Sequence, residues 1–130
     1  MRGVTLEAKC RGVERATGAE LKIVYDGKRP IRVEASDPEL DYTASVPIEF
    51  PSGAERAIKL MHALIYGRRS DAVKRRQNHR CIHCNERNPL EIDHIRSRGA
   101  HGRDDRMANL QGVCAYPFGC DTHRRKHGNA

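Results

Sequence analysis

The sequence contains no tryptophan, and aromatic residues make up only 5% of its 130 residues, whereas charged residues make up 32%. Few large apolar side chains are therefore available to form a core. A chain of this length forms one ordinary domain, or one small domain with an appendage. We expect a small core, and we expect something besides apolar packing to help hold it together.

Long apolar runs are also lacking. No stretch approaches the roughly 20 apolar residues that a membrane-spanning helix needs. The first ten residues, MRGVTLEAKC, lack the apolar segment of a signal peptide. These features predict a cytoplasmic protein with no membrane partner. The sequence also contains no internal repeat and no low-complexity stretch.

Basic charge is concentrated in the second half of the chain. The net charge is +7, and residues 1–66 carry ten Lys and Arg against ten Asp and Glu. Residues 67–130 carry fourteen against seven, so this half holds the whole excess. A basic half is expected to bind a polyanion, which makes DNA or RNA the predicted partner.

Residues 4–50 contain β-branched and apolar runs separated by turn signals, which predict a short antiparallel sheet. The best hairpin candidate is ELKIVYDGKRPIRVEAS, with Asp26 and Gly27 at or near its turn. Cys10 stands alone in a stretch that resembles a strand. It is expected to pack rather than to react.

Residues 51–80 are predicted to form two helices. Ser52 and Glu55 have the spacing of a capping box, and apolar residues then recur at helical spacing over about 53–66. That helix is expected to end near Gly67, where the composition changes and a module boundary is predicted. A second helix is expected over about 70–78. The basic residues in or beside it either contact phosphates or form a solvated face: Lys74, Arg75, Arg76 and Arg80.

Four of the five cysteines fall within 40 residues of one another, as the pairs Cys81 and Cys84 in CIHC and Cys114 and Cys120 in CAYPFGC. In a reducing compartment such a cluster indicates a metal more often than disulfides. Two turns that each offer two thiolates suit the tetrahedral shell of zinc. His83 could replace a cysteine as ligand, but its position between two cysteines favours an outward orientation.

Polar residues gather between and after these cysteine pairs. Asp93 and His94 end the strand-like LEIDHI, a loop over 96–108 brings the chain back, and NLQGV supplies a second strand. The ending DTHRRKHGNA predicts a short helix. His123 and His127 are four residues apart there, so they lie on one helical face and can bind one ion together.

This strand, strand, helix pattern resembles the HNH endonuclease family, whose core is the ββα-metal fold and many of whose members carry a four-cysteine zinc site. The match spans residues 81–127, a little over a third of the chain. The resemblance implies an α+β fold in which an HNH core at 81–130 is preceded by a β-rich region of unknown role at 1–50 and a helical connecting segment at 51–80.

The resemblance also implies roles for single residues. His94 would be the general base that takes a proton from water, and Asp93 would bind the catalytic divalent ion, Mg²⁺ or Mn²⁺. Asn109 would hold the His94 imidazole in orientation through the backbone of the return loop. His123 would complete the metal shell, and the His-x-x-x-His spacing of colicin-type nucleases makes His127 a further ligand. The structural zinc would be held by Cys81, Cys84, Cys114 and Cys120.

The residue types agree with the chemistry of phosphodiester hydrolysis, which needs an activated water and neutralised phosphoryl oxygens. Arg96, Arg98 and Arg103 flank the proposed site, where they would add positive charge or face solvent. The alternative from another class is a zinc-stapled module that binds nucleic acid without cutting it. RNA remains open as a substrate, and the sequence carries no signal for the oligomeric state.

Overall fold

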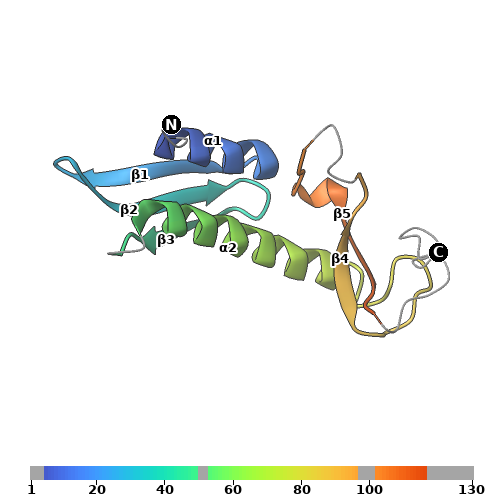
Figure 1. The fold of residues 1–130 in the computed structure, drawn as a ribbon. Coiled ribbons are helices and arrows are strands. Elements are labelled where there is room, and N and C mark those ends of the chain that lie inside the picture. The colour runs from blue at the N-terminus through green and yellow to red at the C-terminus, as the bar shows by residue number, and fades with distance from the viewer. Residues whose placement is uncertain (1–4, 50–52, 97–101, 117–130) are drawn as a thin grey trace.

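The computed structural model describes residues 5–49, 53–96 and 102–116 (Figure 1). A helix and a three-stranded sheet are followed by a long second helix and a two-stranded sheet. The fold class is therefore α+β, as predicted. None of the helices in these ranges combines the length and the apolarity that a membrane span requires.

Helix α1 (Leu6–Thr17) occupies a stretch that was predicted to be strand-like, so that prediction is wrong. The Thr5 hydroxyl accepts a hydrogen bond from the backbone N–H of Ala8 at 3.1 Å, which caps the start of the helix. Gly18 ends it with a φ of 76°, a left-handed conformation that favours glycine. Cys10 is one of the buried residues of this helix.

The three-stranded antiparallel sheet has the order β1 (Glu20–Asp26), β2 (Arg29–Asp37), β3 (Tyr42–Pro47). Asp26 pairs with Arg29 across the first turn, and Gly27 takes a φ of 65° there. The predicted hairpin is confirmed. The apolar residues that alternate along the strands pack with both helices into one core, which includes Leu21, Ile23, Val33, Ala35, Ala44 and Val46.

Helix α2 (Gly53–Arg76) is one continuous helix, so the predictions of two helices and of a helix end near Gly67 are wrong. Glycine lowers helix stability by only about 1 kcal/mol, which tertiary packing readily offsets. Buried positions continue on both sides of Gly67, from Ile58, Met61 and Ile65 to Val73. Ser52, the proposed start of the capping box, lies outside the described residues.

The second sheet is a hairpin of β4 (Leu90–His94) and β5 (Leu110–Cys114), the two strands predicted from LEIDHI and NLQGV. A short 3-10 helix, η2 (Met107–Asn109), leads into β5. Figure 1 shows α2 running from the three-stranded sheet to this hairpin. Gln77, just past the end of α2, fixes the junction, because its side chain accepts from the Gly112 N–H at 2.9 Å and donates to the Gly112 carbonyl at 3.0 Å.

Candidate active site and metal centre

A fully buried carboxylate, Asp105, lies at the centre of the polar cluster around His94. Its Oδ1 is 2.7 Å from Nε2 of His94, and its Oδ2 is 2.7 Å from Nε2 of His62 on α2. The Nε of Arg103 also donates to Oδ2, at 2.6 Å. The cluster thus joins the end of β4, the return loop and the middle of α2.

These donors keep Asp105 ionised. Burial by itself would raise the pKa of the carboxyl group, but hydrogen bonds from His62 and His94 and the charge of Arg103 outweigh it and lower the pKa to about 2. A buried carboxylate with such partners is a strong hydrogen-bond acceptor at neutral pH.

The His94 ring is also stacked. It lies parallel to the ring of Tyr66, with 5.9 Å between centroids and 1° between planes. The guanidinium of Arg103 lies over the Tyr66 ring, 5.1 Å from its centroid. Together with the bond to Asp105, the stack fixes both the position and the tilt of the imidazole.

The backbone of Asp105 forms hydrogen bonds to the two helices that precede the hairpin, α1 and α2. The Asp105 N–H donates to the Ala16 carbonyl of α1 at 2.7 Å. The Asp105 carbonyl accepts from Arg69 of α2 at 2.9 Å. Arg69 is itself fully buried and forms an ion pair with Asp37 of β2 at 2.7 Å. Asp105 is therefore held by α1, α2 and β2.

Asn109 organises the return loop rather than touching the imidazole. Its Oδ1 accepts from the Arg96 N–H at 2.8 Å, and its Nδ2 donates to the carbonyls of Arg96 at 3.2 Å and Asp104 at 2.8 Å. These bonds link the residues after His94 to those before Asp105. That Asn109 orients the His94 imidazole through the loop backbone stays a prediction.

Asp93, the proposed ligand of the catalytic ion, is 6% exposed. Its Oδ2 accepts from the side chain of Gln111, its cross-strand partner, at 2.8 Å. Asp93 and His94 thus have different partners although they are neighbours in the chain. The residues proposed to complete the ion's shell, His123 and His127, lie outside the described residues, as do Arg98 and Cys120.

Three of the four predicted zinc ligands come together. The sulfur atoms of Cys81, Cys84 and Cys114 lie within 4.8 Å of one another, and Cys81 and Cys114 are buried. His83 is exposed and is not part of this group, as expected. Three convergent thiols fit a structural metal site that prefers sulfur ligands, and zinc is the metal that such sites most often hold.

The surroundings of the thiols shift the pKa values of Cys81 and Cys84 in opposite directions. Burial raises the pKa of Cys81, but backbone N–H groups of Cys84, His83 and Cys114 outweigh it and lower the pKa to about 7. The Glu86 backbone N–H lowers the pKa of Cys84. Burial and the neighbouring thiols outweigh this effect and raise the pKa to about 12. A bound metal cation would favour the thiolate form of these cysteines.

The basic residues predicted to bind phosphate lie at the end of α2 and just beyond it. Arg75 is exposed and Lys74 half-buried. Arg76 donates to the Leu110 carbonyl at 3.3 Å, and Arg80 donates to the Asn85 carbonyl at 3.1 Å. Arg96, at the start of the return loop, is exposed and 3.6 Å from Asp104.

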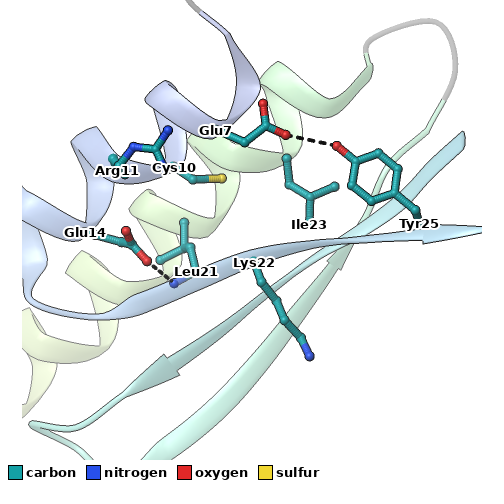
Figure 2. Close-up of a pocket in the computed structure, with 8 residues that line it drawn as sticks. All are labelled: Glu7, Cys10, Arg11, Glu14, Leu21, Lys22, Ile23 and Tyr25. Carbon is teal, nitrogen blue, oxygen red and sulfur yellow. Dashed lines mark hydrogen bonds between the residues drawn. The ribbon is translucent and has the colours of Figure 1, made fainter. Parts of the chain in front are cut away.

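A cavity between α1 and β1 carries no comparable chemistry (Figure 2). Two of its acidic side chains are already engaged, because Tyr25 donates to Glu7 at 3.1 Å and the Leu21 N–H donates to Glu14 at 2.9 Å. Cys10 in its wall is 6% exposed, and burial and the two nearby glutamates raise the pKa of its thiol. Cys10 is a packing residue, as predicted.

The sequence reasoning did not identify Asp105, His62 or Tyr66. One signal was available, since His62, Tyr66 and Arg69 follow one another at helical spacing beside the apolar Ile58, Ile65 and Val73. Polar residues on a face that must be buried point to partners elsewhere in the chain. Asp104 and Asp105 are neighbouring acids that could be such partners. The sequence does not indicate which of the two contacts the histidines.

Comparison with family models, with curated proteins and with solved structures finds no match to this chain.

Proposed function

We propose that this protein is a metal-dependent endonuclease of the HNH type that hydrolyses phosphodiester bonds of DNA. The observation that carries the proposal is His94, which ends β4 with its ring fixed by Asp105 and Tyr66. Such an imidazole, part exposed and held by a buried carboxylate, is suited to general-base chemistry. The proposal also draws on the resemblance to the HNH family.

In the proposed reaction the oxygen of a water molecule bonds to phosphorus while the P–O3′ bond breaks. The proton of that water passes to the His94 imidazole, and the 3′-oxygen leaves and is protonated by solvent. Asp93 supplies the carboxylate ligand type that Mg²⁺ and Mn²⁺ prefer, with His123 and His127 proposed to complete the site. A divalent ion bound there would neutralise the charge that develops on the phosphoryl oxygens.

The DNA would approach the end of α2 and the hairpin. A hollow of about 640 Å³ lies between these elements, and its lining includes Arg76, Arg80 and Gln111, the partner of Asp93. Lys74 and Arg75 extend the positive charge along the helix. Phosphate contacts from such side chains give affinity without sequence preference.

A plasmid-cleavage assay tests the proposal. We expect nicking or linearisation with Mg²⁺ or Mn²⁺ and none with EDTA. His94→Ala should lower the rate by at least about 100-fold, the usual range for loss of a general base, while zinc content and DNA affinity stay close to wild type. Lys59→Ala is the control, because Lys59 is exposed on α2 far from the proposed DNA surface.

Two results would contradict the proposal. Wild-type rates in His94→Ala would show that His94 is not the base. A wild-type protein that binds DNA but cleaves neither DNA nor RNA with any divalent ion would instead be the zinc-stapled binding module.

A further inference from the structure

The structure assigns Asp105, supported by His62 of α2, as the residue that positions His94 and sets which of its two ring nitrogens can accept a proton. This inference rests on the proposed function for its kinetic consequence, but not for its geometry. It makes α1, α2 and β2 part of the proposed active site. His62 belongs to α2, and the residues that hold Asp105 in place, directly or through Arg69, belong to α1, α2 and β2.

The tautomer of His94 follows from the acceptor chemistry of a carboxylate. An ionised carboxylate has no proton to donate, so each nitrogen that bonds to it must carry the hydrogen. Nε2 of His94 lies 2.7 Å from Oδ1, and Nε2 of His62 lies 2.7 Å from Oδ2. Both rings are therefore held as the Nε2–H form. In the neutral His94 ring this leaves the lone pair on Nδ1, which becomes the proton-accepting atom.

The two carboxylate oxygens are not equivalent, and the difference makes a sharp test possible. Oδ2 receives two donors, His62 and Arg103, whereas His94 is the donor to Oδ1. In Asp105→Asn, one oxygen becomes an amide NH₂ group. The remaining oxygen is expected at the Oδ2 position, where two donors need it. The NH₂ group then faces His94, which must accept there and carry its hydrogen on Nδ1.

Asp105→Asn is therefore expected to switch the tautomer of His94 and to leave that of His62 unchanged. Long-range ¹H–¹⁵N correlation spectra of the imidazole rings report the tautomer directly, with the two rings assigned from His94→Gln and His62→Gln. Asp104→Asn is the matched control, because it makes the same chemical change one residue away on a carboxylate that pairs with Arg96 and Arg106. Both rings should keep the Nε2–H form in that control.

The kinetic consequence is a loss of rate without a loss of binding. The single-turnover cleavage rate constant of Asp105→Asn at saturating DNA should fall by about 100-fold or more, since the wrong tautomer of a catalytic histidine lowers rates by up to about 10⁴-fold in other enzymes. The dissociation constant for DNA should change by less than about threefold. A residue with a merely structural role would move both quantities, or neither.

His62 is tested by a graded pair of substitutions. His62→Ala removes a donor from Oδ2 and should lower the rate constant by about tenfold, because the carboxylate is then less well fixed. His62→Gln, whose amide can still donate, should recover most of that loss. Equal rates for wild type and His62→Ala would remove His62 from the proposal.

Two results would overturn the main inference: a wild-type spectrum in which His94 carries its hydrogen on Nδ1, or wild-type cleavage by folded Asp105→Asn. The wild-type spectrum needs no variant, so the inference remains testable if Asp105→Asn fails to fold. If the wild-type protein cleaves no nucleic acid, the proposed function fails, whereas the spectra still decide whether Asp105 sets the tautomer.

Discussion

Asp105 shows how one side chain can be held by opposing effects. Burial disfavours its charge, yet three donors from different parts of the chain lower its pKa to about 2. A carboxyl group whose pKa is lower in the folded state than in the unfolded state stabilises the fold at every pH above its unfolded value, about 3.9. That stability is lost progressively as the pH falls from about 4 to about 2.

The expected consequence is a pH-dependent difference between wild type and Asp105→Asn. The lowered pKa corresponds to about 2.5 kcal/mol in the free energy of unfolding. Denaturant titrations at pH 5.5 should give a difference near this size, and the difference should shrink steadily toward pH 2.5. Any metal that the three thiols hold would be released at low pH from both proteins alike, so the comparison removes that effect. A difference that stays constant with pH would contradict the role of the charge.

The sequence permitted part of this site to be predicted. Asp93, His94 and Asn109 were proposed from the resemblance to the HNH family, which rests on residues close together in the sequence on or beside two short strands, and their roles stay predictions. Asp105 and His62 are 43 residues apart, and their contact depends on how α2 packs against the hairpin. Local patterns do not contain that information, because it arises only when the tertiary structure forms.

At the scale of elements, α2 carries the connection between the two sheets. Its first half shares a core with the three-stranded sheet through Ile58, Met61 and Ile65, and its last turns reach the hairpin. The local sequence around Gly67 favours a break, as predicted, but the helix continues because both halves have apolar surfaces to cover. Tertiary packing therefore overrides the local preference at this position.

Gly67→Ala tests the continuity of α2. Gly67 is exposed, and a Cβ atom added there would meet nothing within 4 Å. Alanine should stabilise the protein by about 0.5–1 kcal/mol, because it restricts the unfolded chain and favours the helix. Equilibrium unfolding in urea measures this as a higher midpoint with an unchanged slope.

Gly18→Ala is the matched control for that experiment. Gly18 has a φ of 76° at the end of α1, where an added Cβ would lie 3.4 Å from Nε of Arg106. Alanine should therefore destabilise the protein at this position, by about 1 kcal/mol. Destabilisation of similar size by Gly67→Ala would indicate that α2 breaks at Gly67.

At the scale of the whole molecule, two apolar clusters are described. One joins α1, α2 and the three-stranded sheet, and the other surrounds Cys81, Val113 and Cys114. The second cluster is small, so we expect the hairpin to depend on a metal held by these thiols for much of its stability. We expect no such dependence of α1 and the three-stranded sheet, which have the larger core.

Cys84→Ser should therefore remove the zinc and unfold the hairpin while α1, the three-stranded sheet and most of α2 persist. Metal analysis should find about one zinc per wild-type molecule and almost none in the variant. Hydrogen exchange should show lost protection in β4 and β5 with protection kept in β1–β3. Cys10→Ala is the control that keeps the metal, because Cys10 lies in the other cluster. Full protection of β5 in zinc-free Cys84→Ser would contradict this dependence.

The uneven distribution of charge over the molecule leads to a prediction about DNA binding. Arg76 and Arg80 donate to backbone carbonyls, so their removal would also disturb the fold. Lys74 and Arg75 are the better pair to neutralise. If both contact phosphates, the double Ala variant should bind all DNA sequences more weakly, and the slope of log K against log salt concentration should become shallower by about 2.

The matched control is the double variant Arg56→Ala with Lys59→Ala. Both residues are exposed near the other end of the same helix and carry the same total charge. Fluorescence anisotropy with a labelled duplex at several salt concentrations measures both slopes. Equal slopes for the two double variants would mean that the end of α2 is a solvated face and that the affinity for DNA depends only on the net charge of the protein.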